Sequence, residues 1–215
     1  FHAMYLVNFA DGDRIGKFSV RTLISELKLA SRMNVKGSII HLGSFKSKEK
    51  PTPVHYDKLL KNIQEVLDKT PDDTFFIIEN AGNRKICCSL EELGFIVKEL
   101  NSHRVRVCLD TCHLFAAGYD ISTESSFQQF FALFDKLVGL EKLEVFQIND
   151  SKGALGSFLD RHENIGEGQM TLAPFRFLLN SPLTQRLPMI IETPGFDQKG
   201  PDKQNLDILK SLIAS

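Results

Sequence analysis

The sequence predicts an α/β protein in which short strands alternate with amphipathic helices around a parallel sheet. Short apolar or β-branched runs alternate with longer stretches in which apolar residues recur every three or four positions. The chain has 215 residues, of which 42% are hydrophobic and 25% charged, and this is the composition of a globular protein. We find no linker and therefore expect a single domain over residues 1–215.

The predicted elements follow one another in a regular order along the chain. A helix over 20–33 precedes a strand over 37–41, and a helix over 59–67 precedes a strand over 74–79. The remaining elements are a helix over 90–100, strands over 105–110, 143–149 and 188–192, and helices over 127–138 and 203–213. Ser89 with Glu92 has the form of a capping box, and Ser122 with Ser125 stands where the next helix should begin.

Each predicted strand carries a polar side chain at or near its end. These residues are His41, Glu79, Asp110, Gln147 and Glu192. In a parallel α/β barrel the carboxyl ends of the strands meet on one face, where active sites are built. Asp and Glu at strand ends often cap the next helix, but this accounts for one or two such residues and not for five. We therefore expect a functional site at this face.

Two short motifs contain further residues of the types that commonly bind zinc. Asp110 closes a strand and His113 follows three residues later, so both can point into one cleft from the strand end and the following turn. Asp160 and His162 lie on the same side of an extended segment, followed by a glycine-rich loop. Taken alone, the first motif is a weak signal, and the second is more typical of a surface loop with ion pairs.

Four histidines and four carboxylates are candidate ligands in these places. They are His2, His41, His113, His162, Glu79, Asp110, Asp160 and Glu192. One zinc takes about four ligands, so eight suit a multinuclear site, and paired metals recur in phosphoester hydrolysis. We assign His55 and His103 to the surface, and we interpret Cys112 as a core residue rather than a soft ligand.

The ordered motifs resemble those of the endonuclease IV family, the trinuclear-zinc apurinic/apyrimidinic endonucleases. The matching blocks are His41-Leu-Gly-Ser44, Glu79-Asn80, Asp110-Thr-Cys-His113, Ala116-Ala-Gly-Tyr-Asp120, Asn149-Asp150-Ser-Lys152, Asp160-Arg-His162, Gly166-Glu-Gly168 and Glu192-Thr193. The resemblance runs from His2 to Glu192. It implies a TIM (β/α)8-type barrel and a zinc-dependent phosphodiesterase of base excision repair, which cuts DNA 5′ to abasic sites and leaves a 3′-hydroxyl.

The resemblance also implies three zinc sites. The ligands would be His2, His41 and Glu79 at the first, Glu79, Asp110 and Glu192 at the second, and His113, Asp160 and His162 at the third. Glu79 would bridge two metals and is the candidate catalytic residue. Tyr5 would contact the DNA near the lesion.

The sequence departs from the family pattern in two places. Gln147 stands where the family has a histidine ligand, so the second metal position would have only oxygen ligands and would accept Mn²⁺ or Mg²⁺. The family also has about two and a half strands before the position of His2. We therefore expect an N-terminally incomplete barrel, with a strand stub at His2 followed by five strands.

Two other functions remain open. A xylose-isomerase-like sugar isomerase or epimerase shares this architecture, but such enzymes generally need one or two metals and no third cluster. A degenerate homologue could bind DNA or metal without cutting, since Gln147 replaces a ligand and strands are missing.

Charge and cysteine content bear on partners and location. The 26 basic and 27 acidic residues give a net charge of −1, so no global basic surface marks a nucleic-acid binder. The resemblance nevertheless implies double-stranded DNA with abasic sites as the partner, and we expect a monomer without membrane contact. The four cysteines fit reduced thiols better than a disulfide framework, which predicts a cytoplasmic protein.

Overall fold

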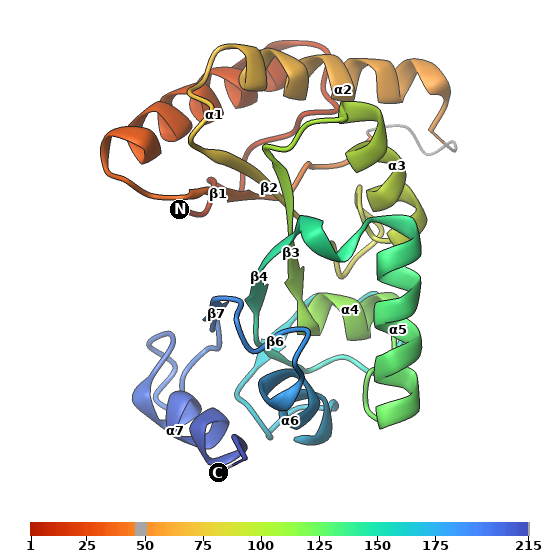
Figure 1. Cartoon of the computed structure of the whole chain (residues 1–215), viewed down its shortest axis with the longest axis vertical. Helices are drawn as coiled ribbons and strands as arrows, with labels where there is room; N and C mark the ends of the chain where they lie inside the picture. The colour runs from red at the N-terminus through yellow and green to blue at the C-terminus, as the bar shows by residue number, and fades with distance from the viewer. Residues whose placement is uncertain (46–50, 215) are drawn as a thin grey trace. The chain divides into compact units, whose positions relative to one another are not determined.

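The structure, a computed structural model, describes residues 1–45 and 51–214, which form two compact units. The first unit contains Phe1–Asn80 and Lys85–Cys108, and the second contains Ala81–Arg84 and Leu109–Ser215. The strands of the main sheet follow the order β1-β2-β3-β4-β7, which is also their order along the chain (Figure 1). Strand β3 (Val105–Asp110) begins in the first unit and ends in the second.

The first unit is built on parallel strands. Strand β1 (Gly37–Ile40) pairs with β2 (Phe75–Glu79), and β2 pairs with β3 from Phe76 opposite Val105 onward. All four residues of β1 are buried, as expected for a strand covered on both faces. Ahead of these strands, His2 forms a parallel bridge with Ile39, and this is the strand stub that the sequence predicts.

Three helices complete the first unit. They are α1 (Arg14–Arg32), α2 (Pro53–Asp68) and α3 (Leu90–Leu100). Figure 1 shows α1 and α2 side by side, and α1 packs on β1 through a buried stripe that includes Leu23 and Leu27. Each helix has one apolar face, so burial of that face against the sheet stabilises both partners.

The second unit combines two parallel strands with a short hairpin. Strand β4 (Leu143–Gln147) pairs with β7 (Met189–Ile190), whereas β5 (Asp150–Ser151) and β6 (His162–Glu163) are antiparallel. The helices are α4 (Thr111–Ala117), α5 (Glu124–Leu137), α6 (Ala173–Asn180) and α7 (Lys203–Ser211), and Leu140–Lys142 is a 3₁₀ turn. Phenylalanines of α5, among them Phe127, Phe130 and Phe131, form much of the core.

The five predicted strands and five predicted helices are all present, with shifted ends. The strand predictions are confirmed, although β1 stops before His41 and β7 stops before Glu192. The capping prediction at Ser89 is confirmed, because its side chain accepts a hydrogen bond from the Glu92 amide. The prediction for the next helix is wrong by one residue, since Thr123 and Ser126 form the capping box. The sequence reasoning missed α4, α6 and the β5–β6 hairpin.

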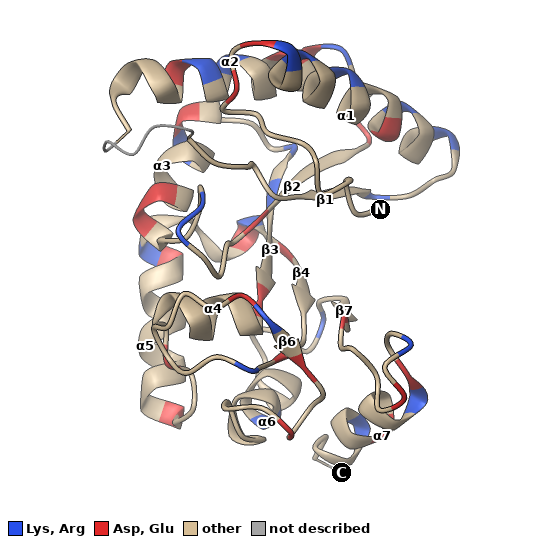
Figure 2. Cartoon of the chain, turned by 180° about the vertical axis from the view of Figure 1, so that it is seen from behind, with Lys and Arg blue, Asp and Glu red and all other residues tan. Residues whose placement is uncertain are grey.

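Among the described residues, none of the helices combines the length and the apolar character that a membrane span requires. Figure 2 shows basic and acidic residues interspersed along α1 and α2. These two helices therefore carry no long basic stripe of the kind that follows a DNA backbone.

Candidate metal centre

In the first unit, two histidines converge on one buried carboxylate. Glu79 ends β2 and is 1% exposed, and His41 follows β1 directly. The Nε2 atoms of His2 and His41 lie 3.0 and 3.3 Å from Oε2 of Glu79. Their ligand atoms all lie within 4.8 Å of one another. The parallel pairing of β1 and β2 brings these residues together, because it aligns the carboxyl ends of the two strands.

The Nδ1 atom of His2 makes a hydrogen bond that indicates which ring nitrogen carries the proton. Nδ1 of His2 lies 2.8 Å from the carbonyl oxygen of Ala3, which can only accept, so Nδ1 carries a proton. In the neutral ring, the lone pair of Nε2 then faces the Glu79 carboxylate. Either a proton on Nε2 or a metal cation shared by the two atoms accounts for a separation this short. Two atoms that each lie about 2.0 to 2.1 Å from a tetrahedral zinc are about 3.3 Å apart, so the observed separations fit a shared zinc.

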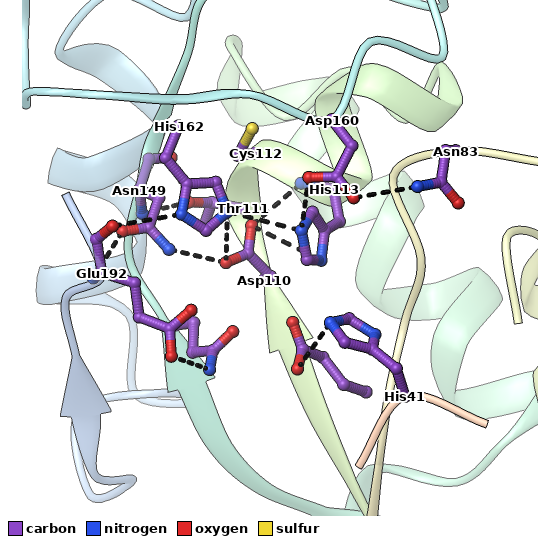
Figure 3. Close-up of polar contacts among 12 residues, drawn as sticks. His41, Asn83, Asp110, Thr111, Cys112, His113, Asn149, Asp160, His162 and Glu192 are labelled. Carbon is purple, nitrogen blue, oxygen red and sulfur yellow. Dashed lines mark hydrogen bonds and ion pairs between the residues drawn. The ribbon is translucent and has the colours of Figure 1, made fainter. Parts of the chain in front are cut away.

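A second cluster lies in the second unit. Nε2 of His113 is 3.0 Å from Oδ1 of Asp160 and 3.4 Å from Nε2 of His162 (Figure 3). His162 opens β6, and its Nδ1 lies 3.2 Å from the carbonyl oxygen of Glu192, which directs Nε2 towards His113. Two imidazole nitrogens and one carboxylate oxygen are a donor set that zinc prefers.

Asp110 links strand β3 to helix α4 and faces the same cluster. It caps α4, because its Oδ1 accepts a hydrogen bond of 2.9 Å from the His113 amide. Its Oδ2 lies 3.6 Å from Nε2 of His162 and accepts a bond of 2.6 Å from Nδ2 of Asn149. His113 is therefore placed by the first turn of a helix and not by a loop, which is a correction to the predicted strand-end turn.

The side chains of Gln147 and Glu192 are hydrogen-bonded to each other. Nε2 of Gln147 donates a bond of 2.9 Å to Oε1 of Glu192. Gln147 is fully buried, yet its Oε1 has no hydrogen-bond partner among the described residues. A buried carbonyl oxygen of this kind can bind a cation. Among the described residues of the second unit, Glu192 belongs to no group of three close His, Cys, Asp or Glu ligands.

Three of the four cysteines, Cys87, Cys108 and Cys112, are buried. Sγ of Cys112 lies close to Asp110 and His162, but burial raises the pKa of this thiol to about 12. Its Sγ also donates to the carbonyl oxygen of Arg161 at 3.6 Å. Burial likewise raises the pKa of Cys87 well above its usual value. All four cysteines are described and are free thiols.

Asp150 organises the glycine-rich loop that follows β6. Its carboxylate accepts hydrogen bonds from the amides of Ser151, Gly166, Gly168 and Met170. Burial raises the pKa of Asp150, and these four bonds oppose that rise. A Cβ on Gly168 would lie 2.3 Å from Oδ1 of Asp150, so only glycine fits there. The loop glycines thus allow the backbone amides to approach this carboxylate closely enough to donate hydrogen bonds to it.

An exposed pair of side chains follows His2 in the first unit. Tyr5 is 75% exposed and Leu6 is 73% exposed. Nζ of Lys85 lies 2.7 Å from the Tyr5 hydroxyl and 4.5 Å from the centroid of its ring. Tyr5, the residue that the resemblance assigns to DNA contact, is therefore open to a ligand on this face of the first unit. His103 is exposed, as predicted, and His55 is half-buried in the cap of α2.

Comparison with known proteins first shows the class of fold to which the chain belongs. Residues 1–212 match the family described as "Xylose isomerase-like TIM barrel". A solved D-tagatose 3-epimerase-like protein superposes with a TM-score of 0.77 over 98% of this chain and 75% of its own length, at 19% identity. Similarity at this identity shows the fold alone. The predicted TIM-type barrel fold is confirmed.

Proteins with higher sequence identity to this chain show the family within that fold class. A probable endonuclease 4 from Sulfurihydrogenibium sp. (strain YO3AOP1) is 36% identical over 216 residues, which cover 99% of this chain and 76% of the relative. The crystal structure of endonuclease IV from Thermus thermophilus has a TM-score of 0.83 at 28% identity and covers 99% of this chain and 74% of that one. The chain belongs to the endonuclease IV family, as its motifs predicted.

Proposed function

We propose that the chain is a zinc-dependent endonuclease that cleaves double-stranded DNA 5′ to abasic sites and leaves a 3′-hydroxyl. The observation that carries this proposal is the pair of histidine and carboxylate clusters, whose atoms are spaced like ligands of tetrahedral zinc. Family membership supports the choice of a DNA phosphodiester as substrate. A repair enzyme of this kind would work inside the cell, bound to DNA and away from membranes.

The proposed ligand sets follow the two clusters. His2, His41 and Glu79 would hold one zinc, and His113, Asp160 and His162 would hold another. The resemblance assigns Asp110, Gln147 and Glu192, together with the bridging Glu79, to a further metal position, and this assignment stays a prediction. When bound, such metals supply Lewis-acid charge and activate water for attack on phosphorus.

The chain's own residues supply orientation and DNA contacts. The backbone carbonyls that accept from Nδ1 of His2 and His162 hold both rings with Nε2 outward. The exposed Tyr5 ring can stack on a base next to the abasic site. Lys85, which lies beside Tyr5, can form an ion pair with a DNA phosphate. A nucleotide that has lost its base costs least to displace from the helix, which favours abasic substrates.

A duplex oligonucleotide with a single abasic site tests the proposal. We expect cleavage on the 5′ side of the site, a product end that a DNA polymerase can extend, and no cleavage of the intact duplex. His113→Ala and His2→Ala should each reduce cleavage by orders of magnitude, because each removes a proposed zinc ligand.

Other results would identify other functions. Binding of the abasic duplex without cleavage would show a degenerate homologue. Epimerisation of a ketose without any action on DNA would show a sugar epimerase of the same fold.

A further inference from the structure

In the second unit, each carboxylate of the proposed metal centre accepts a hydrogen bond from a side-chain amide. The pairs are Asn149 with Asp110 at 2.6 Å, Gln147 with Glu192 at 2.9 Å, and Asn83 with Asp160 at 3.1 Å. Such an amide is neutral, so it fixes a carboxylate oxygen without neutralising the charge that attracts a cation. A lysine or arginine in its place would compete with the metal.

Asn149 is the most constrained of the three amides. It is fully buried, and its side chain makes two hydrogen bonds with different elements. Nδ2 donates to Oδ2 of Asp110 at the end of β3, and Oδ1 accepts a bond of 2.7 Å from the backbone amide of Glu192, after β7. Figure 3 shows Asn149 between these two residues. One side chain therefore sets the position of both carboxylate residues.

The backbone of Asn149 is held as firmly as its side chain. Its amide donates to Oγ1 of Thr111 at 2.9 Å, and the same hydroxyl donates to its carbonyl oxygen at 2.7 Å. Thr111 is buried and is the first residue of α4, next to Asp110. The backbone of Asn149 is thus anchored to the residue next to Asp110.

We propose that Asn149 is a positioning residue of the metal centre, which orients Asp110 and Glu192 as metal ligands. This inference rests on the proposed function. Because the amide occupies one lone pair of Asp110 and anchors the backbone at Glu192, it preorganises both carboxylates before a cation arrives. Loss of a partner that orients metal ligands typically weakens metal binding by about 10- to 100-fold.

Metal titration without DNA tests this proposal. The purified full chain is stripped with a chelator and titrated with Co²⁺, whose visible absorption reports the number and geometry of its ligands. The variants are Asn149→Ala, which removes both bonds, and Asn149→Leu, which removes them but refills the volume. Asn205→Ala is the matched control, because Asn205 is also fully buried in the second unit and its side chain bonds to Asn164 and Asp202.

We expect both Asn149 variants to lose about 10- to 100-fold in Co²⁺ affinity with an altered spectrum, while Asn205→Ala loses thermal stability only. An affinity within about twofold of the wild type and an unchanged spectrum would overturn the proposal. So would failure of both Asn149 variants to fold while Asn205→Ala folds, since the role would then be structural. If the wild type binds Co²⁺ but leaves abasic DNA intact, the proposed function fails and the positioning role is still decided by the titration.

Discussion

At the scale of single residues, Gln147 distinguishes this chain from the family pattern. An amide oxygen is a weaker zinc ligand than imidazole and suits harder cations. We expect Gln147→His to raise the zinc content after dialysis against zinc with excess manganese, whereas Gln128→His on the exposed face of α5 should not. Equal zinc content in all three proteins, with equal cleavage rates in zinc and manganese, would make Gln147 a neutral replacement.

Tyr5 carries the prediction for DNA binding. Stacking on one base contributes about 1 to 3 kcal/mol, so Tyr5→Ala should weaken binding to an abasic duplex by about tenfold or more. The melting temperature should not change, because the side chain is 75% exposed. Fluorescence anisotropy measures the affinity, with Val54→Ala, also exposed, as control. Equal affinity of the two variants would argue against a role for Tyr5.

Residue types explain which site residues the sequence could reveal. Histidine and carboxylate at the ends of apolar strands are unusual, so His41, Glu79 and Asp110 could be found from the pattern. Asn149 and Asn83 could not, because asparagine is common in every loop and its hydrogen bonds depend on the tertiary structure. Its sequence signals, the Asn149-Asp150-Ser-Lys152 motif and a place two residues after the end of β4, do not specify which groups its side chain contacts.

At the scale of elements, Arg104 holds helix α2 to the sheet. It is 3% exposed, and its guanidinium donates to the carbonyl oxygens of Leu67, Thr70 and Thr74. Because these carbonyls would lose buried donors, Arg104→Met should lower the free energy of unfolding by about 3 kcal/mol. Urea unfolding followed by circular dichroism measures this. An unfolding midpoint equal to that of the exposed control Arg21→Met would contradict it.

Asp150 stabilises the glycine-rich loop through hydrogen bonds to its backbone. Both of its oxygens accept two backbone amides each. In Asp150→Asn one oxygen becomes an NH₂ group that faces amide donors, so we expect a lower melting temperature and faster hydrogen exchange at Gly166 and Gly168. Unchanged exchange at both glycines would show that the loop is held by other contacts.

The elements that sequence reasoning missed share a physical feature. Residues 111–116 of α4 are all buried, so the helix lacks the exposed polar face that makes an amphipathic helix recognisable in a sequence. Strands β5 and β6 have two residues each, too few for an alternating pattern. By contrast, β2 is an apolar run of four residues before Glu79, the pattern that a buried parallel strand typically has.

At the scale of the whole molecule, charge links metal binding to DNA binding. The chain carries a net charge of −1. Three zinc ions would bring it to about +5 if the ligands titrate normally. Removal of metal should therefore lower both the melting temperature and the affinity for DNA, because clustered carboxylates then repel one another and the phosphates. Unchanged values of both quantities after chelation would exclude this linkage.

The barrel class could be predicted from the sequence, since the strand and helix patterns and the ordered motifs agree. The division into two compact units could not, because it depends on packing that no local pattern records. The single-domain expectation stays a prediction.

The central claim is metal-dependent cleavage at abasic sites. The most direct measurement is the rate at which the purified chain nicks an abasic duplex before chelation, after chelation, and after zinc is restored. We predict cleavage 5′ to the lesion that is lost with the metal and returns with zinc. Cleavage at an equal rate in the stripped protein, or no cleavage in any of the three states, would contradict the claim.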